Sequence, residues 1–235
     1  REILRFDRSL LYDTTSWNLP MMFDVETVAL GAAPPAGERF TGWPDVAREA
    51  LDRTTSIGWV APTADDRTVA LAARLMERGV RVSIAEKAFP LGESAAARGS
   101  VLVLRVDNRL TGAALEDIIV EESLALNVLL RPLRTGIGPG DEPDLGGEHF
   151  DLLERPRIAI LSRSLLDHYS VGECWHAIDQ WLGVRASLLD ADTVQFNDLR
   201  RYNVLVVPNS WGRSPVSALG DDLVPRVPCG AMLLA

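Results

Sequence analysis

The residues of this sequence that most resemble a chemical site are histidines and carboxylates between positions 168 and 179. Hydrolytic zinc requires two or three histidine or carboxylate ligands and an open position for water. Neither His-Glu-x-x-His nor His-x-x-Glu occurs around the three histidines, of which His149 lies apart from the others. The nearest set of metal-binding residue types is His168, Glu173, His176 and Asp179. The last three of these could share one face of a helix.

A capping box accounts for part of this set without a metal. In Ser170-Val171-Gly172-Glu173, the Ser170 side chain would accept a hydrogen bond from the Glu173 amide, and the Glu173 carboxylate would accept one from the Ser170 amide. We therefore expect no metal site in this chain and expect His176 to be solvated. A site that contains His168 and His176 is the alternative.

The chain offers no assignable nucleophile. A Gly-x-Ser-x-Gly elbow is absent from the sequence. Cys174 follows Glu173 inside a predicted helix, where the carboxylate would raise the pKa of the thiol, so we expect a buried structural cysteine. Cys229 is expected in a loop, and whether the two cysteines pair is open. Gly136-x-Gly138-x-Gly140 is not set between a strand and a helix and predicts a linker. No catalytic residue is therefore assigned.

Weak signals for ligand binding follow the apolar run that ends at Val207. Asn209 and Trp211 stand just beyond this predicted strand. In open α/β sheets, ligands bind beyond the carboxyl ends of the strands. These two residues are therefore the candidate ligand-binding residues of the chain.

Two stretches alternate predicted strands with predicted helices. The first has strands at 57–61, 80–85, 101–106 and 128–133. Its first helix starts at Asp65 or Asp66 and stops at Gly79, and its second carries four apolar residues at helical spacing. The apolar residues assigned to these helix faces are Val69, Ala72, Ala73 and Met76, then Leu115, Ile118, Ile119 and Leu126.

The second stretch has strands at 157–161, 184–189, 204–208 and 230–235, with a short helical turn at 197–201. One helix face is predicted from Val171, Trp175, Ile178 and Leu182, with a stop at Gly183. The fold class is therefore α/β, with two successive β-α-β units and mainly parallel sheets. The second unit is expected to be flavodoxin-like.

These patterns divide the chain into four parts. We expect an irregular segment at 1–45, a first α/β unit at 46–142, a linker at 143–155 and a second α/β domain at 156–235. The formal net charge of −9, with scattered acidic residues, argues against nucleic acid as a partner. No apolar stretch reaches the roughly 18 residues of a membrane span.

Several segments resemble one family of enzymes. Tyr12-Asp13-x-x-x-Trp17-x-Leu19-Pro20 resembles the segment that follows the catalytic domain in large zinc carboxypeptidases of the carboxypeptidase A type (peptidase family M14). The stretches 98–103 and 156–160 resemble strand units of the same proteins. The stretches 188–192 and 199–208 resemble their type I glutamine-amidotransferase-like module, here incomplete. The resemblance covers most of the chain through strand and turn residues, which specify a fold more than a reaction.

This resemblance implies that the zinc ligands and the catalytic glutamate lie in an upstream peptidase domain. Zinc is then a cofactor of the parent protein and is not expected in this chain. The expected partner is the upstream peptidase domain of the same polypeptide, and a peptide substrate is a further candidate. By resemblance alone, the location is secreted or periplasmic.

The leading hypothesis is that the chain, which starts at Arg1 without Met, is a non-catalytic accessory fragment of a zinc metallocarboxypeptidase-like protein. It would pack on the peptidase domain or bind a substrate or partner. The alternative is an independent small-molecule-binding or amidotransferase-like α/β module. A third possibility is a defective relative that serves as an interaction scaffold.

Overall fold

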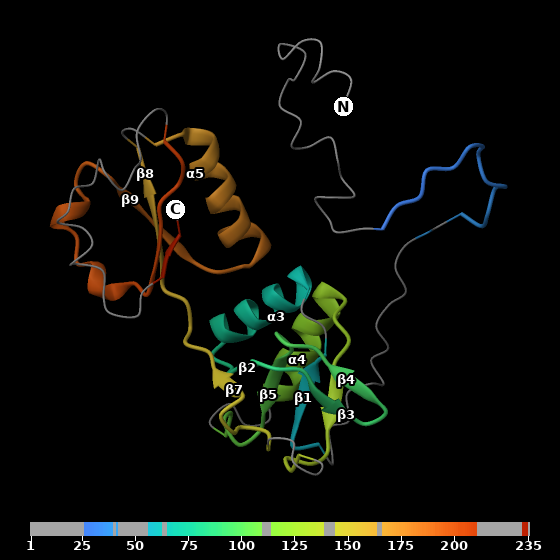
Figure 1. Cartoon of the computed structure of the whole chain (residues 1–235). Helices are drawn as coiled ribbons and strands as arrows, with labels where there is room; N and C mark the ends of the chain where they lie inside the picture. The colour runs from blue at the N-terminus through green and yellow to red at the C-terminus, as the bar shows by residue number, and fades with distance from the viewer. Residues whose placement is uncertain are drawn as a thin grey trace. The chain divides into compact units, whose positions relative to one another are not determined.

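The computed structural model describes residues 26–39, 41, 56–62, 65–109, 114–138, 144–163, 166–210 and 232–234 (Figure 1). The chain divides into two units, 1–43 and 44–235, which are described separately. In the first unit, residues 26–39 and 41 form neither helix nor strand, and all of them are exposed. All the helices and strands discussed below belong to the second unit.

The first sheet has five strands, and every neighbouring pair in it is antiparallel. The strand order is β6-β1-β5-β2-β7. The strands are β1 (Gly58–Ala61), β2 (Ser83–Ala85), β5 (Val101–Leu104), β6 (Arg131–Leu133) and β7 (Phe150–Leu152). The prediction of a mainly parallel sheet is therefore wrong for this five-stranded sheet, although the mixture of helices and strands is as expected.

The physical reason for this error is that the chain makes two strand-helix-strand crossovers, and each crossover places its two strands on either side of a strand from the other. Helix α3 (Asp66–Glu77) connects β1 to β2, and both strands pair with β5, which lies between them. Helix α4 (Ala114–Leu126) connects β5 to β6, which both flank β1. Each crossover joins two parallel strands, but an antiparallel strand separates them. This is the split β-α-β topology of ferredoxin-like sheets.

Strand β7 adds a fifth strand beside β2. It lies inside the stretch 143–155 that the sequence assigns to a linker, and its register pairs Ser83 with Leu152 and Ala85 with Phe150. Two of its three residues are exposed, so its sequence shows only part of the apolar alternation that marks a strand.

Local interactions set the ends of α3. The Asp65 side chain caps α3 by accepting a hydrogen bond from the Thr68 amide at 2.8 Å, and Gly79 follows the helix with φ of 82°. Both termini agree with the prediction. The predicted apolar face is wrong at Val69, which is 57% exposed. In α4, the predicted apolar residues Leu115, Ile119 and Leu126 are buried.

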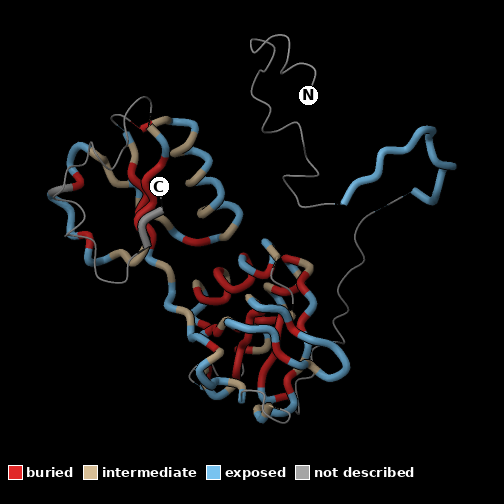
Figure 2. Tube along the Cα trace, in the orientation of Figure 1, coloured by how far each residue is buried: buried red, intermediate tan, exposed pale blue. Residues whose placement is uncertain are grey.

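Apolar clusters pack on both faces of this sheet, and Figure 2 shows its strands as mostly buried. On one face, α3 and α4 pack with Trp59, Val101 and Val103. On the other, a hairpin of β3 (Phe89–Leu91) and β4 (Ser94–Ala96) packs with Val60 and Leu102. The sequence patterns did not predict this hairpin.

The second sheet is parallel throughout, as predicted. Its strand order is β11-β10-β8-β9. The strands are β8 (Ile158–Ser162), β9 (Ala186–Asp190), β10 (Val204–Val206) and β11 (Met232–Leu234). The chain runs from β8 to β9 on one side and then to β10 on the other, so the direction of winding reverses between β8 and β10.

One interrupted helix packs against this sheet. Helix α5 (His168–Trp175) continues as the π-helical η3 (His176–Trp181), which ends before Gly183 with φ of 70°. Val171, Ile178 and Leu182 are half-buried as predicted, but Trp175 is 39% exposed and is not a core residue. Two short 3₁₀ turns, η4 (Val194–Phe196) and η5 (Leu199–Arg201), follow β9. No helix in the described ranges is long and apolar enough to cross a membrane.

We predict that Gly58→Ala destabilises the first sheet by about 1–3 kcal/mol, because the added methyl group has no free space in the packed interior. A Cβ at position 58 would collide with the Val103 carbonyl oxygen and lie 3.0 Å from Leu104 Cα, both on the paired strand. Gly172→Ala is the matched control, since no atom lies within 4 Å of its added Cβ. In the interior of α5 that change should stabilise by up to about 1 kcal/mol. Urea unfolding measures both, and an unchanged midpoint for Gly58→Ala would contradict the packing argument.

Candidate functional site

His168 and His176, the histidines of the alternative metal site, lie on the helix but are far apart along it. His168 opens α5 and His176 opens η3, and both are exposed. Eight residues of helix correspond to a rise of about 12 Å. Histidine pairs that bind one zinc ion from a helix are spaced four residues apart on one face, and the spacing here is twice that. In the part of the chain that the structure describes, no group of three His, Cys, Asp or Glu side chains could hold a metal.

The start of α5 differs from the predicted capping box. The cap is Asp167, whose carboxylate accepts hydrogen bonds from the Tyr169 amide at 3.2 Å and the Ser170 amide at 3.4 Å. The Ser170 hydroxyl itself donates to Asp167 at 3.0 Å. The prediction that Ser170 caps the helix is therefore wrong. An aspartate three residues earlier supplies a charged acceptor that the serine hydroxyl does not match.

Cys174 lies on the half-buried side of α5 and packs with residues of the second sheet. Burial, together with the neighbouring Glu173 carboxylate, raises the pKa of the Cys174 thiol. The direction agrees with the prediction, and it keeps the thiol protonated at neutral pH. The predicted loop around Cys229 lies outside the described residues.

Asn209 lies where the sequence places it, just beyond β10 and at the reversal point of the parallel sheet. Its carbonyl oxygen accepts a hydrogen bond from the Asp167 amide at 2.8 Å, and its side-chain oxygen accepts one from the Ser210 amide at 2.9 Å. The first of these bonds ties the segment after β10 to the start of α5. Trp211, the other candidate ligand-binding residue, lies outside the described residues.

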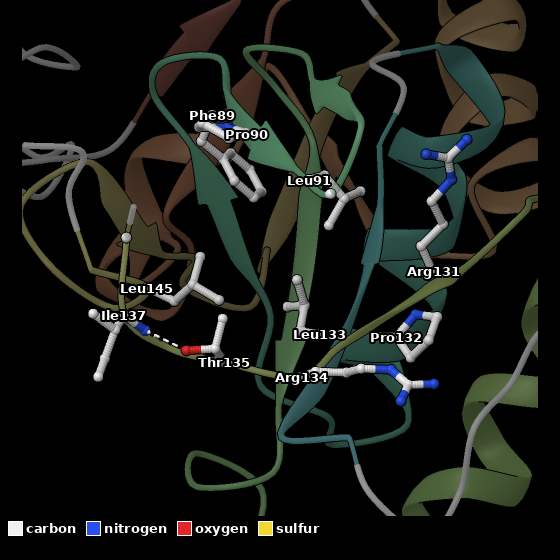
Figure 3. Close-up of a pocket in the computed structure, with 12 residues that line it drawn as sticks. Phe89, Pro90, Leu91, Arg131, Pro132, Leu133, Arg134, Thr135, Ile137 and Leu145 are labelled. Carbon is white, nitrogen blue, oxygen red and sulfur yellow. Dashed lines mark hydrogen bonds between the residues drawn. The ribbon is translucent and has the colours of Figure 1, made fainter. Parts of the chain in front are cut away.

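The five-stranded sheet, α3, α4 and the β3–β4 hairpin together form what we call the ferredoxin-like unit. A pocket of about 860 Å³ lies in this unit, on the face of the sheet that the hairpin covers (Figure 3). Its volume falls in the range typical of sites for small ligands. The hairpin, β6 and the loop after β6 supply the walls. The lining residues are Phe89, Pro90, Leu91, Gly92, Arg131, Pro132, Leu133, Arg134, Thr135, Ile137, Gly138 and Leu145.

Aromatic packing and cross-loop hydrogen bonds hold the walls of this pocket. Phe89 packs edge-on against Phe150 of β7, with ring centroids 5.2 Å apart. Leu133 is buried in the sheet. Across the loop, the Leu145 amide donates to the Gly136 carbonyl at 2.8 Å, and the Gly138 amide donates to the Asp144 carboxylate at 2.9 Å. The two arms of the loop are therefore joined by hydrogen bonds beside the pocket.

The charges that line the pocket are positive. Arg131 and Arg134 lie at one side of the apolar group formed by Leu91, Leu133 and Leu145 (Figure 3). Of the lining residues that the structure describes, none is acidic. The Thr135 hydroxyl oxygen accepts a hydrogen bond from the Ile137 amide at 3.1 Å. Such a lining can bind an apolar group and an anion, but it offers no obvious general base.

The sequence did contain a signal for the hairpin that forms one wall. Gly92 and Glu93 form a two-residue turn between Leu91 and Ser94, and Gly92 has φ of 63°. Glycine in the first central position is the signature of a type II′ hairpin turn. Pro90 and the small residues of β4 concealed the signal, because proline and alanine are depleted in strands.

Comparison of this chain with protein-family models, with curated proteins and with solved structures gives no match. The candidate sites are therefore judged on their geometry.

We predict that Asp167→Ala lowers the free energy of unfolding of the second sheet by about 1 kcal/mol, because the first amides of α5 lose their acceptor. Glu173→Ala is the matched control. A Ser170–Glu173 capping box would make Glu173→Ala the costly change and leave Asp167→Ala nearly neutral, whereas the observed cap predicts almost no effect for Glu173→Ala. Urea unfolding followed by circular dichroism measures the difference, and a larger loss for Glu173→Ala than for Asp167→Ala would restore the capping box.

We also predict that the purified chain retains no stoichiometric zinc after dialysis, because His168 and His176 lie too far apart to share an ion. Zinc content is measured by atomic emission in the wild type and in the double variant His168→Ala/His176→Ala. Both should contain well under one zinc per chain. One zinc per wild-type chain, lost in the double variant, would show that this expectation is wrong.

Proposed function

We propose that this chain is a non-catalytic accessory region of a zinc metallocarboxypeptidase-like protein, and that its ferredoxin-like unit binds a ligand for the parent enzyme. The parent activity would be the hydrolysis of C-terminal residues from peptides, with zinc held in the upstream peptidase domain. A secreted or periplasmic location belongs to the same proposal. The resemblance of the segment from Tyr12 to Pro20 supports the parentage.

The pocket on the hairpin face carries this proposal. Its lining combines apolar side chains such as Leu91 and Leu133 with guanidinium groups, which favour binding. A hydrolytic site would instead need a nucleophile or a metal-bound water beside a general base. A binding unit attached to a catalytic domain supplies affinity or access and leaves the chemistry to that domain.

A second candidate function rests on the parallel sheet. Counted along the chain, its strand order is 2-1-3-4, which corresponds to the first four strands of the flavodoxin-like order 2-1-3-4-5. This order supports an independent small-molecule-binding or amidotransferase-like module with Asn209 and Trp211 at its ligand site. In such sheets the ligand lies at the reversal point, between β8 and β10 here.

The coding sequence upstream of Arg1 distinguishes the two candidates. We expect it to encode a peptidase domain with His-x-x-Glu, a distant histidine and a later catalytic glutamate, because the resemblance assigns the zinc ligands to that domain. Sequencing the locus to its start codon makes the measurement. A start codon within a few residues of Arg1 would contradict the accessory role and favour the independent module.

A further inference from the structure

We infer that the pocket on the hairpin face binds an amphipathic carboxylate, a small molecule with an apolar chain or ring and one carboxylate group. The inference rests on the proposed binding role of this unit and names the chemical class of its ligand. Three features of the described residues lead to it: the apolar walls, the position of Arg131 and the absence of acidic side chains from the described lining.

The apolar walls of the pocket favour a ligand with an apolar chain or ring. Phe89, Leu133 and Leu145 belong to the apolar cluster that the hairpin forms with the sheet, and they surround the middle of the pocket (Figure 3). Phe89 and Leu133 are already buried in the fold, so the apolar surface still open to a ligand comes mainly from half-buried Leu145 and from Ile137, which is 74% exposed. A ligand that covers these surfaces removes apolar area from water, which is the main favourable term in such binding. A fully polar ligand would desolvate its groups here without finding partners.

Arg131 determines the charged end. Its side chain donates a hydrogen bond to the Ser94 hydroxyl on the hairpin, which is its one hydrogen-bond partner among the described residues. A guanidinium has five N–H donors in a planar fork that matches a carboxylate. The serine hydroxyl is neutral, so it orients the side chain without cancelling its charge. Arg131 is therefore positioned to meet an anion at the edge of the apolar surface.

The charges in the rest of the chain do not favour anion binding, so recognition of an anion depends on the residues of the pocket. The chain has a net charge of −9, which disfavours nonspecific attraction of anions. The nearby Asp144 accepts a hydrogen bond from the Gly138 amide within the loop. An anion that binds here must consequently owe its affinity to the arginine side of the pocket, and this can be tested residue by residue.

Isothermal titration calorimetry of the whole chain with decanoate, 1-decanol and decylamine tests the inference. The three probes share one apolar chain and differ in charge. We expect decanoate to bind at least about tenfold more tightly than either of the others, a difference of about 1.4 kcal/mol. Arg131→Gln should reduce decanoate binding to the level of decanol. Arg98→Gln is the matched control, because Arg98 is an exposed arginine of the same unit that is not among the lining residues.

Charge substitutions at Ile137 provide a second measurement that does not depend on Arg131. The position is largely exposed, so Ile137→Glu and Ile137→Lys should leave the unfolding midpoint nearly unchanged. Ile137→Glu should weaken decanoate binding and Ile137→Lys should strengthen it. Equal binding in both variants would place the ligand elsewhere.

Three results would overturn the inference. Decanol binding as tight as decanoate binding would show that the carboxylate is not recognised. Equal losses of decanoate binding in Arg131→Gln and Arg98→Gln would show that only the net charge of the chain matters. Absence of binding by all three probes would also refute this ligand class. None of these outcomes bears on the upstream coding sequence, so failure of the inference and failure of the accessory role are separate.

Discussion

The ferredoxin-like unit depends on the burial of its central strand pair. Every residue of β1 and β5 is buried, so both faces of this pair need an apolar cover. Burial of a large aliphatic side chain contributes about 1.5–3 kcal/mol, so the buried residues of this pair contribute substantially to the stability of the sheet. Helices α3 and α4 cover one face. The other is covered by a hairpin and a loop.

The candidate binding site is a consequence of that second cover. A hairpin and a loop pack less continuously than two helices, and the space between them and β6 is the pocket. The same elements bring Arg131 and Ser94, which are far apart in the sequence, into hydrogen-bond contact. The same residues therefore line the pocket and cover the sheet. Changes at buried Leu133 would consequently disturb both ligand binding and stability, whereas changes at exposed Ile137 would affect binding and leave stability nearly unchanged.

Local patterns in the sequence predicted most of the individual elements. Asp65 and Gly79 mark the ends of α3, and the apolar runs around β1, β5, β8 and β10 mark strands, because capping and side-chain periodicity act within a few residues. The exceptions are also local. Asp167 prevailed over Ser170 as a cap, since a carboxylate interacts more strongly with the first amides of a helix. The hairpin turn at Gly92 was hidden by Pro90 and by small side chains.

The sequence by itself determined the type of most of these elements, the poor fit of His168 and His176 to a zinc motif and the direction in which Glu173 shifts the pKa of the Cys174 thiol, although burial is the larger cause of that shift. Tertiary structure alone decided which strands are neighbours and where a pocket forms. A strand-helix-strand segment has the same local pattern whether its strands touch or, as with β1 and β2, a later strand lies between them. The choice depends on long-range pairing and on the burial of whole faces, and neither is encoded within a single segment.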